Sequence, residues 1–383
     1  MVNLLNKISN LFGGKTERCL VIEELDHCVE VVAAQVDNLD KKIMIEKSRK
    51  SGRLNNLRRP LRQYDRLILG LNSKKATTIE SIVNLKRSEP TIPLNETEID
   101  NLLFRGLWEF LNHYRSWAAK KMNVAEMDLI LFNVEVVDVR LGNHHVFNPE
   151  GFRGKDFSLR FRGTFIPRSV SQLVEKFRVW AKDFIVVEAT AILVSILASL
   201  NDLVVSVSDE YTTVFVYKED ESLYLKGYDW GRVRILDELA KDLRIDNDVA
   251  SQILNSYIEL RISSKFQRFI EQKIRKQVKD FLKMLSPTYS SISGLKSTTH
   301  FLFRFNLPFL ETFFNRVHFR LAAVCETLRL QGFSIDINKR VKDFSVKLNQ
   351  NILALLVYPF SAPKYEFLNQ LLRRRAKWLI ANN

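Results

Sequence analysis

Apolar and polar positions follow two different rhythms along the chain, and the change between them marks out its parts. Over residues 19–47 β-branched residues dominate in short runs, which is typical of a buried hairpin of strands. Two further strands are predicted over 66–71 and 77–86, after a basic stretch at 49–62 that we interpret as a solvated loop. The folded part of the chain is therefore predicted to begin with a sheet.

A helical rhythm begins near residue 89. Asn95 stands three residues before Glu98, a capping-box arrangement, and apolar residues at helical spacing follow. Strands are then predicted over 129–139 and 156–165, joined in part by the turn-rich connector NPEGFRGK at 148–155. We interpret 89–166 as a small β-helix-β-β unit inserted into the chain.

Helices and strands alternate through the rest of the chain. The most distinctive stretch is LVVSVSDEYTTVFVYKEDESLYLK at 203–226, whose two β-branched runs around a polar bend, followed by a third strand, predict a β-meander. The other predicted elements are helices over 169–180, 188–200, 232–243, 247–257 and 261–284, strands over 184–187 and 300–305, and final core elements over 341–348 and 352–357.

The last segment, 363–383, is predicted to be a basic amphipathic helix behind a proline-containing hinge. Leucines fall on one face, arginines and a lysine lie opposite, and a tryptophan stands at the margin, which is typical of a helix lying on a membrane surface. The predicted membrane-binding residues are Leu368, Leu371, Leu372, Arg373, Arg374, Arg375, Lys377, Trp378 and Leu379. A helix docked on the body is the alternative. Residues 2–12 also have helical spacing, and both packing and membrane contact remain open for them.

Composition indicates the charge of the expected partner. The net charge of +14 and pI near 9.6 call for something anionic, either nucleic acid or an acidic membrane surface. The basic residues of 261–284 lie mostly off its apolar stripe, as on any solvated face, so we expect no nucleic acid. Three cysteines without a CxxC motif indicate a reducing cytoplasm. No apolar run reaches the roughly 18 residues of a membrane span.

Motifs that carry catalysis or metal binding are missing from the sequence. Gly13-Gly14-Lys15 lacks the preceding spaced glycine of a P-loop, and no GxSxG, HExxH or GxGxxG occurs. His144-His145 has no Cys, Asp or Glu near it at metal-ligand spacing. We therefore expect neither a catalytic residue nor a metal site.

Four stretches resemble the family of the bacterial cell-division protein FtsA, which belongs to the actin-like ATPases. They are 188–200 with the hairpin after it, the insert with its NP-x-G-x-x-GK connector, the first hairpin at 19–36, and the terminal helix at 363–380. The resemblance implies an α/β, actin-like and ribonuclease-H-like, two-lobed fold with an inserted α+β subdomain of the SHS2 type. It divides the chain into 1–88 (first lobe), 89–166 (insert), 167–200 (first lobe and interdomain helix), 201–340 (second lobe), 341–362 (first lobe) and 363–383 (membrane-targeting helix).

The departures from that family concern its nucleotide site. Family members grip phosphates with glycines at two hairpin tips; here Ser208, Asp209 and Glu210 occupy one tip, and only Thr212 remains from the phosphate-facing set. The other bend, at 24–27, and the adenosine-site region at 300–309 also lack their glycines. At ~4 Å and an effective dielectric of ~20, each carboxylate would oppose a phosphate charge by about 4 kcal/mol. We expect a pseudo-ATPase without cofactor, or ATP with magnesium if the cleft still functions.

The resemblance also implies partners and a place in the cell. It predicts a scaffold on the cytoplasmic side of the cell membrane at the division site, which tethers the tubulin-like FtsZ ring through the terminal helix. Anionic inner-membrane lipids, FtsZ, other division proteins and further copies in a filament are the expected partners. The alternatives are a PilM-like pilus-assembly scaffold, which shares the actin-like core, and a genuine actin-like ATPase.

Overall fold

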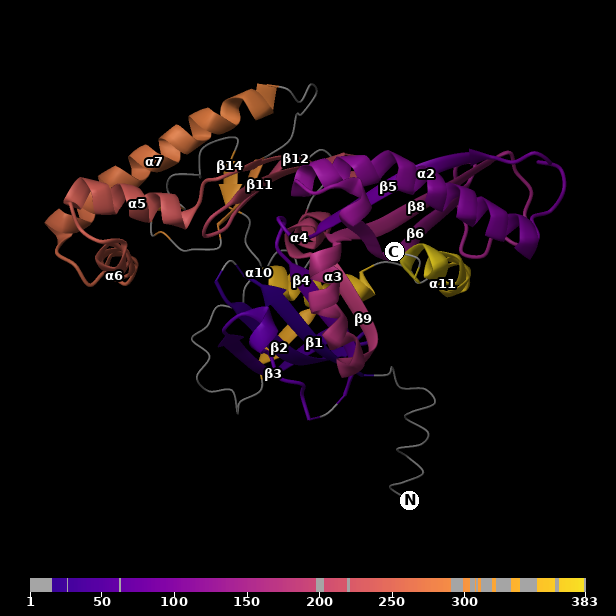
Figure 1. The fold of residues 1–383 in the computed structure, drawn as a ribbon, viewed down its shortest axis with the longest axis horizontal. Coiled ribbons are helices and arrows are strands. Elements are labelled where there is room, and N and C mark those ends of the chain that lie inside the picture. The colour runs from indigo at the N-terminus through magenta and orange to yellow at the C-terminus, as the bar shows by residue number, and fades with distance from the viewer. Residues whose placement is uncertain are drawn as a thin grey trace, which may run out of the picture. The chain divides into compact units, whose positions relative to one another are not determined.

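The structure is a computed structural model that describes residues 16–25, 27–61, 63–197, 203–218, 221–290, 299–303, 307, 309–310, 319–321, 332–337, 350–361 and 365–381. The chain divides into two compact units (Figure 1). Unit 1 comprises Met1–Leu197, Asp220–Ser222 and Val324–Asn383, and unit 2 comprises Ala198–Glu219 and Leu223–Ala323.

A six-stranded mixed sheet forms the base of unit 1. Its strand order is β15-β3-β2-β1-β4-β9, in which β1 pairs antiparallel with β2 and parallel with β4, and β4 pairs parallel with β9. The strands are β1 (Glu17–Glu24), β2 (Val29–Asp37), β3 (Lys42–Ser51), β4 (Tyr64–Leu71), β9 (Ala181–Glu188) and β15 (Ser334–Ile337).

Helices cover this sheet because its central strands are apolar at successive positions. Leu20 and Ile22 of β1 pack in one core with Phe177, which lies in the 3-10 helix η3 (Glu175–Trp180) after α3 (Arg168–Val174). The helix α10 (Gln350–Val357) packs against β1, β4 and α4 (Ala189–Leu197). Strands with both faces covered show continuous apolar runs instead of alternation, as the sequence does here.

A second sheet in unit 1 carries the insert. Its strands run in the order β5-β8-β6-β7, and all their pairings are antiparallel. The long helix α2 lies along one face, and α11 lies beside α2 and β6 (Figure 1). The elements are β5 (Thr77–Lys86), α2 (Glu96–Met122), the 3-10 helix η2 (Glu126–Asp128), β6 (Leu129–Leu141), β7 (His144–His145), β8 (Asp156–Pro167) and α11 (Glu366–Ala381).

Unit 2 combines strands with three helices. Strand β10 pairs antiparallel with β11 and parallel with β13, and β13 pairs with β14. The core contains Trp230 stacked on Phe281, with ring centroids 3.9 Å apart and an interplanar angle of 6°. The elements are β10 (Leu203–Val207), β11 (Thr212–Lys218), β12 (Glu221–Tyr228), α5 (Arg232–Leu243), α6 (Asn247–Ile258), α7 (Ser264–Ser290), β13 (Thr299–Phe303) and β14 (Phe319–Leu321).

Several predicted elements are confirmed. The meander forms β10, β11 and β12, and Asn95 caps α2 by accepting a hydrogen bond from the backbone N–H of Glu98 at 2.8 Å. The mixed α/β fold class is confirmed as well. The structure describes neither residues 2–12 nor 341–348, so both of those predictions fall outside the described residues.

The assignment of two strands and the extent of one helix were predicted wrongly. Residues 334–337, assigned to the second lobe, form β15, which pairs with β3 in unit 1. Residues 77–86, assigned to the first lobe, form β5, which pairs with β8 of the insert. The helix predicted over 169–180 divides into α3 and η3. The pairing partner of a strand is a long-range choice that local periodicity does not encode, and four residues are too few to show a pattern.

Candidate functional site

The hairpin tip between β10 and β11 is a closed turn. The backbone N–H of Ser208 donates to the carbonyl of Tyr211 at 2.9 Å, and the Ser208 hydroxyl donates to the same carbonyl at 2.7 Å. The N–H of Tyr211 in turn donates to Ser208 Oγ at 3.1 Å. The amides of Ser208 and Tyr211, which a phosphate-binding tip would aim at its ligand, are therefore used inside the turn.

The carbonyl oxygens of the tip face the first turn of α5. The N–H of Val233 donates to the carbonyl of Asp209 at 2.8 Å, and that of Arg232 donates to the carbonyl of Ser208 at 3.4 Å. These contacts cap the amino end of the helix, whose first amides have no partner within the helix itself. The end of α5 that carries partial positive charge is thus occupied by the protein's own backbone.

Gly231 makes this close approach possible. A β-carbon at this position would lie 2.5 Å from the carbonyl oxygen of Asp209, a distance at which backbone atoms must move. Thr212, which the resemblance placed at a phosphate-facing position, is buried and donates its hydroxyl to the carbonyl of Trp230 at 2.6 Å. The glycine that the sequence places before α5 therefore serves the contact between helix and hairpin.

The structure brings the four predicted tip residues together, with Asp209 half-buried and Glu210 exposed. Two carboxylates beside a capped helix end give the tip acceptors and negative charge. Chemically, such a surface suits a cation or a hydrogen-bond donor better than a phosphate. In the described part of the chain, no group of three or more His, Cys, Asp or Glu side chains has the arrangement of a metal site.

The first hairpin, between β1 and β2, is also closed by side chains. The N–H of Leu25 donates to the carbonyl of Cys28 at 2.8 Å. Lys75 forms an ion pair with Glu24 at 2.7 Å, and Asn351 of α10 donates to the buried carboxylate of Glu23 at 2.6 Å. Asp26, in the middle of the predicted bend, lies outside the described residues.

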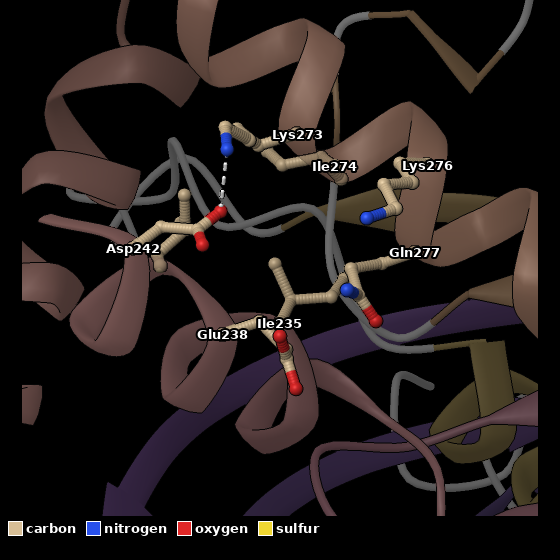
Figure 2. Close-up of a pocket in the computed structure, with 8 residues that line it drawn as sticks. Ile235, Glu238, Asp242, Lys273, Ile274, Lys276 and Gln277 are labelled. Atoms are coloured by element: carbon tan, nitrogen blue, oxygen red, sulfur yellow. Dashed lines mark ion pairs between the residues drawn. The ribbon is translucent and has the colours of Figure 1, made fainter.

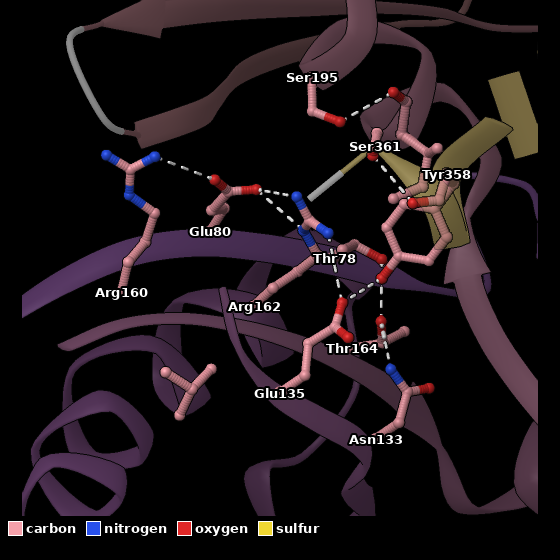
Figure 3. Close-up of polar contacts among 12 residues, drawn as sticks. Thr78, Glu80, Asn133, Glu135, Arg160, Arg162, Thr164, Ser195, Tyr358 and Ser361 are labelled. Atoms are coloured by element: carbon pink, nitrogen blue, oxygen red, sulfur yellow. Dashed lines mark hydrogen bonds and ion pairs between the residues drawn. The ribbon is translucent and has the colours of Figure 1, made fainter. Parts of the chain in front are cut away.

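A buried ionic network lies on the insert sheet, on the face opposite α2. Arg162 of β8 stands between two carboxylates, with ion-pair distances of 2.7 Å to Glu80 of β5 and 3.2 Å to Glu135 of β6 (Figure 3). Tyr358 of the 3-10 helix η4 (Tyr358–Phe360) donates its hydroxyl to Glu135 at 2.6 Å. Its ring lies under the guanidinium of Arg162, 4.9 Å from ring centroid to Cζ. This network joins three strands to the segment after α10.

At Arg162, burial and the neighbouring carboxylates shift the pKa in opposite directions. Burial alone lowers the pKa of Arg162, but the carboxylates of Glu80 and Glu135 raise it well above its ordinary value, so the guanidinium stays charged. Burial and the charge of Glu135 raise the pKa of Tyr358, so the phenol stays neutral. A buried pair of this kind is costly to break, because removing one partner leaves an unpaired charge inside the protein.

A second buried pair fixes α2 to β9. Lys121 donates to both carboxylate oxygens of Glu188 at 3.0 Å, and Glu188 also accepts from the N–H of Thr78 at 3.2 Å. Burial lowers the pKa of Lys121, and the carboxylate of Glu188 acts in the opposite direction. Each oxygen has a partner, as buried carboxylates require.

The terminal helix α11 is docked on the insert, which contradicts the prediction of a helix lying on a membrane. Leu368 and Leu372 are 0% exposed and Leu371 is 4% exposed; together with Tyr365 and Ala376 they complete the core formed by α2, β6 and β8. The apolar stripe was correctly identified. The insert covers this stripe, as in the docked alternative, because it offers a matching apolar surface.

Polar contacts hold the same helix at the edge of the sheet. The side chain of Asn369 accepts from the N–H of Val136 at 2.7 Å and donates to its carbonyl at 3.0 Å, as a neighbouring strand would. Arg375 pairs with Asp100 of α2, with 2.9 Å between Nε and Oδ2. Arg373 and Arg374 are exposed, whereas the side chains of Lys377, Trp378 and Leu379 lie outside the described residues.

The hollows on the described surface include two of very different size. One lies between α5 and α7 in unit 2, beside the ion pair of Lys273 and Asp242, and its volume of about 30 Å³ admits about one water molecule (Figure 2). The other, of about 410 Å³, lies in the insert beside Phe147 and Phe152, which are 67% and 53% exposed. Only the second is large enough to hold a side chain of a partner.

Sequence reasoning missed the ionic network, Gly231 and the docking contacts of Asn369. A signal existed for the network: Arg160, Arg162 and Thr164 alternate with apolar residues along one predicted strand, which places them on one face. No comparable signal marked Asn369, whose partner is a backbone 233 positions earlier in the chain. Among the described helices, none is both long and apolar enough to span a bilayer.

Comparison with known proteins identifies the fold. No protein-family model matches the sequence, and no curated protein matches it either. Among solved structures, a chain of the PilM–PilN type IV pilus biogenesis complex matches with a TM-score of 0.55 and 11% identity, over 90% of this chain and 99% of that one. The ethanolamine utilization protein EutJ from Carboxydothermus hydrogenoformans matches with a TM-score of 0.40 and 8% identity, over 94% and 97%. The fold is that of the actin-like ATPases.

Proposed function

We propose that this chain is an actin-like scaffold that joins protein partners in a membrane-associated bacterial assembly and does not turn over nucleotide. The observation that carries the proposal is the tip of the β10–β11 hairpin. Its carbonyl oxygens cap α5, its carboxylates stand where family members have glycines, and its only retained threonine bonds to the backbone of Trp230. A site with these groups lacks the converging amide donors that phosphates need.

The assembly is best matched to the type IV pilus machinery. The PilM chain of the PilM–PilN complex shares the fold over 99% of its own length, and in that complex it is bound to a second protein. A scaffold of this kind needs a rigid body and a partner surface. The ionic network around Arg162 supplies rigidity, and the hollow beside Phe147 and Phe152 offers apolar surface for a partner.

The decisive experiment for the nucleotide part is isothermal titration calorimetry of the full chain with ATP and magnesium. We expect no binding in the micromolar range, while a nucleotide-binding actin-like protein run in parallel binds. The Asp209→Gly/Glu210→Gly double variant tests the carboxylates separately, because it removes their charge and leaves the capping carbonyls in place. Micromolar binding by the natural chain, together with phosphate release, would overturn the proposal.

A division scaffold that links FtsZ to the membrane is the second candidate. The sequence of the connector at 148–155 favours it; in the structure Gly151 has a φ of +81°, and its N–H donates to the carbonyl of Leu94, just before α2. The same connector sequence carries the resemblance to the FtsA family. Direct binding assays with purified FtsZ and with a PilN-type protein distinguish the two candidates, and the genes beside the coding sequence give a rapid first answer.

A further inference from the structure

One end of the six-stranded sheet gathers four chain segments of unit 1. Strand pairing places them there: Glu17 is opposite Val36, Cys19 is opposite Arg66, and Tyr64 is opposite Ala181. The chain therefore enters β1, β4 and β9 at this end, and the turn after β2 lies there as well. We name it the sheet end.

Apolar side chains project into solvent at the sheet end. Leu61 is 106% exposed, Leu39 in the turn after β2 is 66% exposed and Val179 before β9 is 54% exposed. Single exposed apolar residues are ordinary on protein surfaces. Leu39 lies apart, in the turn between β2 and β3, whereas Leu61 and Val179 lie on loops that the contact between Arg59 and Val179 joins, and this pair marks the candidate partner surface.

Basic side chains accompany the exposed leucine. Leu61 follows Arg58, Arg59 and Pro60, and Arg59 donates to the carbonyl of Val179 at 3.3 Å, which joins this loop to η3. Arg58 and Arg59 are exposed, and neither forms an ion pair with a carboxylate among the described residues. Neither has a carboxylate partner to give up in the described part of the chain, so both can bind an external anion.

The acidic residues beside β4 and β9 at the sheet end are paired, whereas Asp37 and Asp40 lie at the turn after β2, on the other side of β1. Asp65 pairs with Lys182 at 2.8 Å, Asp183 with Arg66 at 3.1 Å, and Glu175 with Arg178 at 2.8 Å. Glu17 lies 3.3 Å from the same Arg66. Beside β4 and β9, these pairs leave Arg58 and Arg59 as a local excess of positive charge.

The beginning of the chain adds charge of the same sign. Residues 1–15 lie outside the described residues, but they connect to β1 at the sheet end. Residues 1–16 read MVNLLNKISNLFGGKT, with two lysines and no acidic residue. The sequence of this segment therefore contains no carboxylate that could pair with Arg58 and Arg59.

We propose that the sheet end binds an anionic lipid surface, with Leu61 entering the boundary between headgroups and acyl chains and the two arginines bound to lipid phosphates. The side chains of the loop that carries Leu61 favour lipid over nucleic acid as the anionic partner. Single-stranded nucleic acid needs exposed aromatic rings on which bases stack, and the exposed apolar residues described here are aliphatic. An exposed leucine beside arginines is typical of interfacial anchors. This contact is separate from nucleotide chemistry and from α11.

Vesicle co-sedimentation of the full chain tests the proposal. The probes are vesicles of phosphatidylcholine alone and of phosphatidylcholine with phosphatidylglycerol in equal amounts. We expect binding to the anionic vesicles only, and a loss of about thirtyfold in affinity for Arg58→Gln/Arg59→Gln, since each basic residue near such a surface attracts it independently. Leu61→Ser should weaken binding as well, and it keeps the test valid because a side chain that is fully exposed does not support the fold.

Matched controls locate the contact. Met127→Ser removes an exposed apolar side chain of the insert, and Arg373→Gln/Arg374→Gln removes two exposed arginines of α11. Both should leave vesicle binding unchanged. Vesicle binding that is lost with the α11 variant but kept by the Arg58/Arg59 variant would overturn the proposal. So would an absence of vesicle binding accompanied by salt-dependent binding of a DNA fragment that needs Arg58 and Arg59. PilN-type or FtsZ binding, measured without lipid, tests the scaffold function independently.

Discussion

Unit 1 contains two basic segments with leucines, which differ in how far the protein buries their side chains. In α11 the leucines at 368, 371 and 372 are buried against the insert, and Arg375 is paired with Asp100. In the loop at 57–61 the sequence is LRRPL; Leu57 is buried, but Leu61 is fully exposed and both arginines lack a carboxylate partner among the described residues. The segment with the stronger amphipathic pattern is the one that the protein covers itself.

The difference shows which structural features an amphipathic pattern predicts and which it does not. Periodicity identifies which side chains share a face, but the identity of the surface that covers this face depends on complementary groups elsewhere. For α11 these groups are the apolar side chains of α2 and β6, the open backbone of Val136, and Asp100. For the loop, the core of the six-stranded sheet covers Leu57 and the carbonyl of Val179 accepts from Arg59, but Leu61 stays exposed. The contrast can be tested by changing one segment at a time.

The largest effect is expected from Leu368→Ala in α11. This side chain is 0% exposed, so its truncation leaves a cavity in the core of the insert and should cost about 2–5 kcal/mol. We expect faster amide hydrogen exchange throughout α11 and a lower urea midpoint. Leu61→Ala is the matched control and should change neither. If both variants behave alike, α11 is not docked in solution as it is in the structure.

Asn369→Ala should have a smaller but clear effect. It removes the two hydrogen bonds that the side chain makes with Val136 and leaves the backbone groups of an edge strand without these partners. A loss of about 1–3 kcal/mol in the free energy of unfolding of the docked helix is expected. The neighbouring Gln370 is exposed, and Gln370→Ala should stay within about 0.5 kcal/mol of the natural chain. Hydrogen exchange of α11 measures both, and equal exchange would show that the edge contact contributes nothing.

Much of the fold could be predicted from the sequence, and the features that were missed have physical causes. The strands, the capped helix α2 and the meander carry local signals, namely β-branched runs, a capping residue and alternation. The membership of β5 and β15 in their sheets was missed because pairing is decided by distant strands. The tip residues at 208–212 were located correctly, but their bonds to Trp230 and to the start of α5 depend on the approach that Gly231 permits.

Acid should weaken the attachment of α11 at its first residues. Burial alone raises the pKa of Asp138, but hydrogen bonds from His145 and Tyr365 and the charge of Arg160 outweigh it, so the pKa lies below its ordinary value of 3.8. A lowered pKa means that this carboxylate stabilises the fold above about pH 4, and the contribution is lost as the pH falls through the lower, folded value.

The measurement is the urea midpoint of the natural chain and of Asp138→Asn between neutral and acidic pH. The natural chain should be more stable at neutral pH, and the two should converge below pH 3.8, the ordinary value. Arg140 also pairs with this carboxylate, at 3.1 Å. A constant difference between the two chains at all pH values would mean that the bonds to His145 and Tyr365 do not depend on the charge of Asp138.

The smallest effect on stability is expected from Leu61→Ser, and for that reason it is the sharpest test of the comparison. A side chain that is 106% exposed buries no apolar area, so its removal should change the free energy of unfolding by less than about 0.5 kcal/mol. The same substitution should weaken binding to anionic vesicles. A residue needed for lipid binding but not for folding belongs to a surface selected for a partner, whereas a drop in stability would show that Leu61 is covered in solution and that the two basic segments are alike after all.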